Sequence, residues 1–346
     1  MSSRVKIINP VGYPHWDEIV LSSGCSFFLS SAWARVLADT YGYTPLYFTI
    51  FDADKQLAAL VPMMEVKSIF TGSRGVSLPF SDYCEPIWDN EMDREELINK
   101  IIEHAGARGW KYVELRPEKK SARHWGVSTS YLNHQLNISL DEKKLFASCR
   151  ASTRRNIKKA LDAGVACSIN TSMQSVEQFY GLNCMTRKRH GIPPQPFAFF
   201  KNVHRHIISQ GHGVVVLASH DQQVVAGAVY FNFGKQAMYK YGASDLSRQE
   251  LRANYLVMWE AIRWYCRAGY EIFDMGKTEP SNTGLNQFKT GWNAQPGEIF
   301  YYKYDLKKQS FAAENSRQTS LSEKLLPYLP VALLRMIGTV AYRHVA

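Results

Sequence analysis

The stretch ARGWKYVELRPE at residues 107–118 decides the fold, because a closely similar stretch, RAGYEIFDMGKTE, occupies residues 267–279. A second pair, DKQLAALVP at 54–62 and DQQVVAGAV at 221–229, recurs at nearly the same separation. In the first pair, Gly109 and Gly269 stand where a helix needs a left-handed terminating residue. The two pairs therefore predict one unit, containing a hairpin, a helix and a strand, that occurs twice in the chain.

Hydrophobic periodicity extends this pattern outward on both sides. In the first half it predicts a helix over 31–41, strands over 46–51 and 56–66, a helix over 94–107 and a strand over 110–116. In the second half it predicts a helix over 173–189, strands within 214–220 and 223–244, a helix over 251–268 and a strand over 270–276. The repeated order predicts an α/β protein with mixed central sheets. A chance match between short segments is the alternative.

Composition limits the classes of function. The hydrophobic content of 45% allows a sizeable core, and the formal charge of +10 with a pI near 9.2 favours anionic partners. The six cysteines are scattered without a CxxC pair, which predicts a reduced, cytoplasmic protein without a structural metal. We also expect neither a signal peptide nor a membrane-spanning segment, because no long uncharged apolar run occurs.

Two segments carry charge or amphipathic patterns. Residues 141–165 predict a helix on which Arg150, Arg154 and Lys158 recur every four positions, forming either an anion-binding face or an ordinary solvated one. Residues 307–324 read as a polar linker, and 325–346 as an amphipathic helix. That helix suits the membrane interface or packing on the protein itself, and both options stay open.

Chemistry-bearing residues occur at strand ends and in loops, where α/β proteins place their sites. Asp82 lies in the apolar segment LPFSDYCEP and could serve either as a general base or as a loop cap. Tyr239 and Tyr241 alternate in a predicted strand, so both should project to one face. Lys289, in GLNQFKTGWNAQPG, is expected to be either a surface charge or a fixed positive point for a phosphate or carboxylate.

The ordered segments TRRNIKKALDAGV, MTRKRHG, MYKYGASD and GLNQFKTGWNA resemble the FemABX-like transferases, including the BioF2-like branch, over roughly residues 25–305. This resemblance implies two tandem domains of the GNAT type, which we place at 1–145 and 146–306. It also implies a bacterial acyltransferase or aminoacyltransferase that modifies an amine of a cell-envelope or polysaccharide precursor. Peptidoglycan precursors are one possible acceptor. However, the apolar segment PPQPFAFF stands where precursor-binding members carry an Arg and a Tyr.

The resemblance also implies roles for individual residues. Asp82 and Tyr241 would be catalytic, and the donor would bind at Arg248, Arg252 and Asn254. The substrate would contact a larger group of aromatic and basic side chains, namely Phe288, Lys289, Tyr239, Arg187, Arg189, Arg154 and Lys158. In RQELRA, residues 248–253, Leu251 replaces a Gly of the acyl-CoA loop R/Q-x-x-G-x-G/A, so the donor stays open between acyl-CoA and aminoacyl-tRNA.

The expected partners are an anionic or lipid-linked substrate, tRNA if it carries the donor, and the inner face of a membrane. No tightly bound cofactor and no metal are expected. Two noncatalytic alternatives remain: a binder of nucleic acid or another anionic polymer, which would use the basic helix, and a peripheral membrane scaffold.

Overall fold

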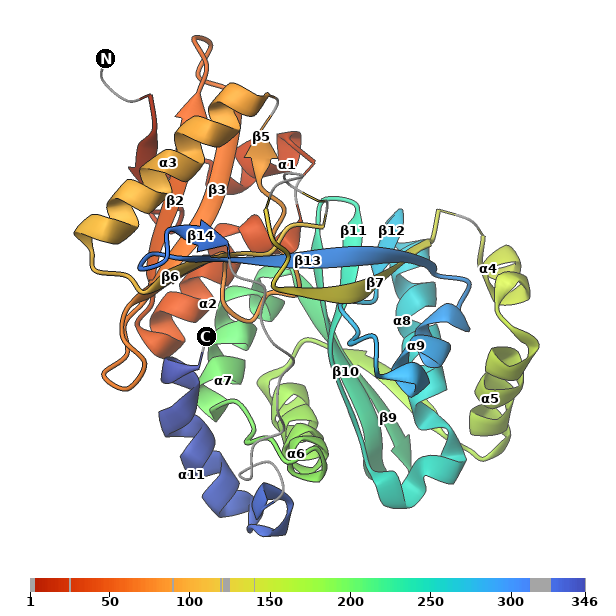
Figure 1. The fold of residues 1–346 in the computed structure, drawn as a ribbon. Coiled ribbons are helices and arrows are strands. Elements are labelled where there is room, and N and C mark those ends of the chain that lie inside the picture. Colours follow the sequence, from red (N-terminus) through yellow and green to blue (C-terminus); the bar gives the residue numbers. More distant parts are fainter. Residues whose placement is uncertain are drawn as a thin grey trace. The chain divides into compact units, whose positions relative to one another are not determined.

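The structure is a computed structural model that describes residues 4–24, 26–88, 90–118, 120, 125–139, 141–311 and 325–345. The chain divides into two compact units (Figure 1). Unit 1 comprises residues 1–131, 298–317 and 341–346, and unit 2 comprises 132–297 and 318–340. Most of the predicted linker, residues 312–324, lies outside the described residues.

Unit 1 is built on a mixed sheet with the strand order β1-β2-β3-β4-β6-β13. β4 and β6 are parallel, and the other neighbouring pairs are antiparallel. Its elements are β1 (Lys6–Ile8), α1 (Trp16–Ser22), η1 (Phe27–Leu29), α2 (Ser31–Tyr41), β2 (Thr44–Phe51), β3 (Leu57–Val66), β4 (Arg74–Val76), β5 (Ile87–Trp88), α3 (Glu91–Ala107), β6 (Tyr112–Leu115), β13 (Gln295–Asp305), β14 (Ser310–Phe311) and η5 (Tyr342–His344).

Unit 2 has a mixed sheet with the strand order β8-β9-β10-β11-β12-β7, in which β11 and β12 are the parallel pair. Its elements are β7 (Thr129–Asn137), α4 (Glu142–Ser148), α5 (Ala151–Asp162), β8 (Ala166–Asn170), α6 (Met173–Arg189), α7 (Phe197–His206), η2 (Ile208–Gln210), β9 (Gly213–His220), β10 (Gln223–Phe233), β11 (Gln236–Ser244), η3 (Leu246–Leu251), α8 (Ala253–Arg267), β12 (Ile272–Asp274), α9 (Thr283–Thr290), η4 (Leu326–Tyr328) and α11 (Val331–Ala341).

The strand orders of the two sheets correspond one to one, with the parallel pair in the same place, so the repeated unit predicted from the sequence is present in the fold. The glycines that end α3 and α8 behave alike. Gly109 and Gly269 have φ of 64° and 79°, and the following amides, of Trp110 and Tyr270, donate to carbonyls five residues back. Each turn thereby satisfies a helix-end carbonyl and directs the chain into a strand of the sheet.

The last strand of each sheet comes from an unexpected part of the chain. β7 follows β6 in sequence but pairs with β12, whereas β13 follows β12 but pairs with β6. Unit 1 consequently contains residues 298–305, which the sequence analysis assigns to the second domain. Short periodic segments identify strands, but they carry no information about which distant strand supplies the final partner.

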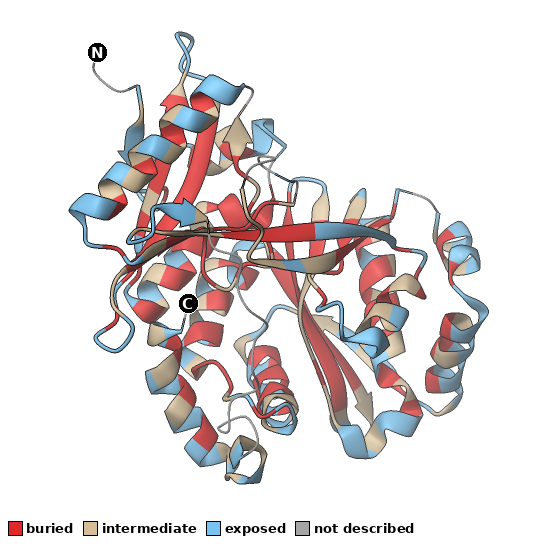
Figure 2. Cartoon of the chain, in the orientation of Figure 1, coloured by how far each residue is buried: buried red, intermediate tan, exposed pale blue. Residues whose placement is uncertain are grey.

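Each unit has its own hydrophobic core between its sheet and its helices. Leu97, Ile101 and Ala105 line the buried stripe of α3 and pack with β2 and β3 side chains such as Phe48 and Val61. α8 fills the corresponding place in unit 2 with its own buried face. Figure 2 shows this burial along β2, β3, β9 and β10, with exposed residues on the outer faces of α3 and α5.

The predicted C-terminal helix corresponds to α11, which spans residues 331–341, and part of its predicted apolar arc packs on the protein. Leu334 and Gly338 are buried, while Leu333, Met336 and Val340 are exposed. Gly338 lies so close to the Pro194 carbonyl that a Cβ would collide with it. Within the residues that can be described, no helix is both long and apolar enough to cross a bilayer.

Candidate functional site

The start of α8 provides backbone amides suited to an anion. Among the described residues no side chain caps this fifteen-residue helix. The Tyr255 amide donates to the Arg252 carbonyl over 2.9 Å, whereas the amides of Ala253 and Asn254 come before the first hydrogen bond within the helix. Arg252 precedes it in a left-handed conformation with φ of 56°, and its buried Nε lacks a hydrogen-bond partner among the described residues. The Asn254 amide donates to the Ser244 hydroxyl at the end of β11, over 3.1 Å. The predicted donor residues Arg252 and Asn254 thus flank this helix start, and Arg248 lies in the preceding η3 turn.

β11 leads directly into this region and separates from its parallel neighbour. The β11–β12 ladder runs from Gln236 to Met238, where Met238 pairs with Asp274, while β11 continues to Ser244. A register shift also occurs in the β10–β11 ladder between Tyr239 and Tyr241. Divergence of two parallel strands toward a helix N-terminus is a geometry in which an extended ligand with a phosphate end can bind.

The register shift overturns the prediction that Tyr239 and Tyr241 share one face. Tyr239 packs against Tyr230 in the core beneath α8, whereas Tyr241 contacts Phe199 and Phe200 of α7. A bulge adds a residue to one strand and breaks the alternation of side chains. Burial raises the pKa of Tyr239 to about 12, so its phenol stays protonated at neutral pH. The side chains of Tyr239 and Tyr241 therefore project from opposite faces of the sheet.

Lys289 is buried and holds a turn. Its side chain in α9 is only 1% exposed, and Nζ donates to the carbonyls of Gly276 and Lys277 over 2.6 and 3.1 Å. Of the two alternatives for Lys289, the surface charge is therefore wrong, because the ammonium is buried and donates to the backbone that follows β12. The neighbouring Phe288 packs on Tyr255 and Trp292. Contact between Lys289 and a substrate remains a prediction, and the contacts seen here make Lys289 a positioning residue.

A buried polar cluster that the sequence analysis missed surrounds this turn. His134 on β7 is fully buried, and its Nε2 lies 2.9 Å from Oδ1 of Asn286 in α9. Burial lowers the pKa of His134, and the nearby Lys289 charge lowers it further, so the imidazole is neutral at pH 7. Asn286 accepts from Nε2, which leaves Nδ1 as an acceptor without a partner in the described structure. His134 stands between Asn and Gln without a motif, so periodicity did not select it.

Asp274 anchors the other side of the same cluster. One carboxylate oxygen accepts from the Gly276 amide over 2.6 Å, and the other from the side chains of Asn133 and Gln135. β7, β12 and α9 are therefore joined by side chains as well as by strand pairing, and the Gly276–Lys277 turn is fixed from both sides.

The basic residues predicted to bind substrate have different environments. Arg154 donates to the carbonyls of Ala147 and Cys149 at the end of α4, so it caps a helix, whereas Lys158 on α5 is exposed. Arg187 and Arg189 occupy the last turn of α6, where the Thr186 hydroxyl contacts the backbone of Ser244. The α6 arginines thus lie on the helix that abuts the end of β11, whereas the α5 residues belong to a separate surface.

Asp82 lies in unit 1, in a loop with an unusual backbone. Leu78 and Phe80 have φ of 52° and 61°, a conformation that bulky residues rarely adopt. The buried Arg116 donates to the carbonyls of Leu78 and Ser81, and the Tyr301 hydroxyl donates to the Asp82 carbonyl over 2.9 Å. Strained backbone that is braced in this way is concentrated at functional sites. The other predicted site residues all belong to unit 2.

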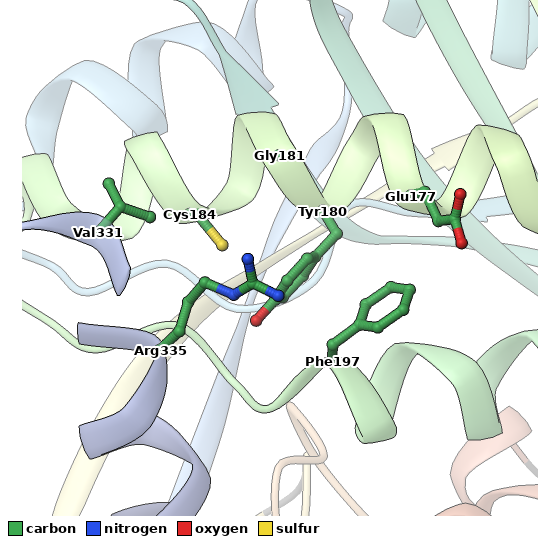
Figure 3. A pocket seen from close by; sticks show the side chains of 7 residues that line it. All are labelled: Glu177, Tyr180, Gly181, Cys184, Phe197, Val331 and Arg335. Carbon is green, nitrogen blue, oxygen red and sulfur yellow. The ribbon is translucent and has the colours of Figure 1, made fainter. Parts of the chain in front are cut away.

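A groove of about 300 Å³ lies between α6, α7 and α11 (Figure 3). The Arg335 guanidinium lies 5.2 Å from the centre of the Tyr180 ring, and Phe197 packs on the same ring. Burial raises the pKa of the Cys184 thiol, which disfavours a nucleophilic thiolate there. The described residues contain no cluster of metal-ligating side chains in this groove or elsewhere.

Comparisons with known proteins agree with this geometry. Residues 147–290, which include β9 to β12, α8 and α9, match the family described as an acetyltransferase (GNAT) domain. No curated protein matches the sequence.

Among solved structures, FemX aligns with a TM-score of 0.68 at 14% identity, covering 84% of this chain and 95% of FemX. L-PGS from Bacillus licheniformis aligns with a TM-score of 0.53 at 14% identity, covering 96% and 99% of the two chains. A tandem GNAT protein from the clavulanic acid biosynthesis pathway aligns at 0.56 and 8% identity, covering 87% and 98%. Residues 147–290 therefore match a GNAT acetyltransferase domain, and the chain has a fold similar to those of FemX and a tandem GNAT protein, as the sequence resemblance predicted.

Proposed function

We propose that the protein transfers an acyl or aminoacyl group from a phosphate-bearing carrier to an amine of a cell-envelope precursor. The main observation that supports this proposal is that β11 separates from β12 beyond Met238. β11 then leads to the start of α8, which has no side-chain cap among the described residues. The carrier's phosphates would bind at that helix start beside Arg252, and its acyl arm would lie along β11. The sheet would thereby orient the acyl carbonyl for attack.

In the reaction, the amine nitrogen attacks the carbonyl carbon and forms the new amide bond. Collapse of the tetrahedral intermediate breaks the bond to the carrier, which leaves as a thiol from CoA or as a ribose hydroxyl from tRNA. The amine proton passes to a general base or to water, and the leaving group takes up a proton. We assign the phenol of Tyr241 as the candidate hydrogen-bond donor to the developing oxyanion.

The details of the helix start support acyl-CoA as the donor. Leu251 replaces a Gly of the CoA loop, and that side chain is buried in the core of unit 2. Because it points inward, it does not occupy the space over the helix N-terminus, and the substitution does not exclude CoA. Aminoacyl-tRNA is the alternative donor, supported by the similarity to FemX and by the exposed basic residues of α5, including Arg155 and Lys158.

The acceptor class and location rest on the structural neighbours and the C-terminal helix. One similar structure, at a TM-score of 0.51 and 14% identity, is a domain of a putative lysylphosphatidylglycerol synthetase. Exposed Leu333, Met336 and Val340 on α11 support contact with a membrane interface. We place the reaction at the inner membrane face, on a peptidoglycan or lipid-linked amine.

A transfer assay tests the proposal. Acetyl-CoA, longer acyl-CoAs and aminoacyl-tRNA are each incubated with amine-bearing peptidoglycan precursors and lipids, and the products are weighed by mass spectrometry. We expect one donor class to support transfer, and Arg252→Gln to weaken donor binding. Arg205→Gln, an exposed substitution on α7, is the matched control.

Transfer from none of these donors, together with salt-sensitive RNA binding that depends on α5, would favour the noncatalytic binder instead. If transfer is unaffected by Arg252→Gln, the proposed activity stands but the proposed donor site beside Arg252 is contradicted.

A further inference from the structure

A surface of unit 1 distant in sequence from the donor site exposes two large apolar side chains next to each other. Ile69 and Phe70 are 88% and 72% exposed, in the loop between β3 and β4. Val345, which follows η5, is also exposed. We call these three residues the Phe70 patch. Scattered exposed apolar residues are common, whereas contiguous exposed apolar surface rimmed by polar residues is a feature of interaction sites.

The loop is held in this conformation by hydrogen bonds. The Ser68 hydroxyl accepts from the amides of Phe70 and Thr71, over 3.2 and 3.0 Å. His344 Nδ1 lies 3.0 Å from the same hydroxyl, and Arg74 donates to the His344 carbonyl over 2.8 Å. The Phe70 ring contacts the edge of the His344 ring at 4.8 Å. The apolar side chains are therefore presented by a braced turn that includes the C-terminal segment.

The border of the patch is basic. Lys67, Lys111 and Arg343 are exposed, and Lys111 extends along the loop at Gly72. Lys67 lies 3.2 Å from Glu65, a buried carboxylate that Arg108 also binds. The charges of Lys67 and Arg108 together exceed the single negative charge of Glu65. Within the described chain, Lys111 and Arg343 form no ion pair. The patch thus combines an apolar tip with a border whose net charge is positive.

We propose that the Phe70 patch docks on the surface of a bilayer that contains anionic phospholipids. Ile69 and Phe70 would enter the boundary between headgroups and acyl chains, and the three cations would contact lipid phosphates. A bilayer fits both features, since it offers apolar depth beneath a negative surface. The inference concerns a surface other than α11 and does not depend on the identity of donor or acceptor.

Co-sedimentation of the full chain with lipid vesicles tests this proposal. Vesicles of phosphatidylcholine alone are compared with vesicles that also contain phosphatidylglycerol. We expect binding to the anionic vesicles, and a loss of at least about tenfold in partition for Ile69→Ser combined with Phe70→Ser. Lys111→Gln and Arg343→Gln should each lower binding about fivefold, on anionic vesicles only. Met92→Ser, which removes another highly exposed apolar side chain of unit 1, is the control and should bind normally.

Three results would overturn the proposal. The double variant could bind vesicles as well as the wild type, or the wild type could bind neutral and anionic vesicles equally. Alternatively, the wild type could self-associate through the patch without binding vesicles, which would make the surface an interface between copies of the chain. If thermal unfolding shows that the double variant is not folded, vesicle binding by Lys111→Gln and Arg343→Gln tests the proposal instead, because these variants change only exposed side chains. Unchanged binding of both to anionic vesicles would then overturn it.

Discussion

Replacing Lys289 with Met separates a turn-holding role from a substrate-binding role. The ammonium is buried, and it donates to the carbonyls of Gly276 and Lys277. Met has a similar length but cannot donate, so both carbonyls would remain buried without this donor. A buried polar group left unsatisfied costs about 1–3 kcal/mol, and packing of the Met chain offsets part of that. We therefore expect a loss of about 2–4 kcal/mol in the free energy of unfolding.

The assay is thermal and urea unfolding of the full chain. At about 2–4 °C per kcal/mol, Lys289→Met should lower Tm by about 4–16 °C. Lys158→Met, at an exposed position on α5, is the matched control and should change stability by less than about 0.5 kcal/mol. If Lys289→Met is as stable as the wild type but loses donor or acceptor binding, the turn-holding role is refuted and Lys289 is a substrate contact.

The remaining predictions concern titration and packing. Glu65 is desolvated, which would raise its pKa, but hydrogen bonds from its neighbours outweigh burial and hold the pKa at about 2, against an ordinary value near 4.5. The ionised Glu65 therefore adds about 3 kcal/mol to the free energy of unfolding above pH 4.5, and this contribution is lost as the pH falls toward 2. The free energy of unfolding of Glu65→Gln should lack this part of the pH dependence. His134 has a lowered pKa, so stability should fall as pH drops below about 6.5, and His134→Gln should flatten this slope in pH-dependent urea titrations. Gly338→Ala should lower the stability measured by thermal unfolding by about 1–3 kcal/mol, because its Cβ meets a backbone carbonyl. Gly181→Ala, in a helix where a Cβ has open space, should raise the stability by about 0.5–1 kcal/mol. Equal effects of the two substitutions would contradict the tight packing of α11.

The element order could be predicted because it depends on local signals. The helix ends at Gly109 and Gly269 and the hairpins beside them follow from backbone preferences, and the predicted limits of α2 and α6 agree with the structure. The hairpin at Asp221 and Gln222 also has positive φ at both turn residues, as a two-residue turn between twisted strands requires.

The site was less predictable because it depends on register and on contacts between distant segments. Alternation placed Tyr239 and Tyr241 on one face, but a shift against β10 separates them. His134 joins the site only because β7 pairs with β12, and Lys289 is buried only because α9 covers the turn after that strand. Neither of these long-range contacts can be predicted from the local sequence.

The central claim is that the donor's phosphates bind at the start of α8. Hydrogen–deuterium exchange with and without the donor that supports transfer tests it most directly, because the first amides of α8 have no partner within the helix. We predict protection of the peptide that spans residues 250–257 and of the end of β11 when donor is bound. Protection confined to α5, with no change at the start of α8, would contradict the claim.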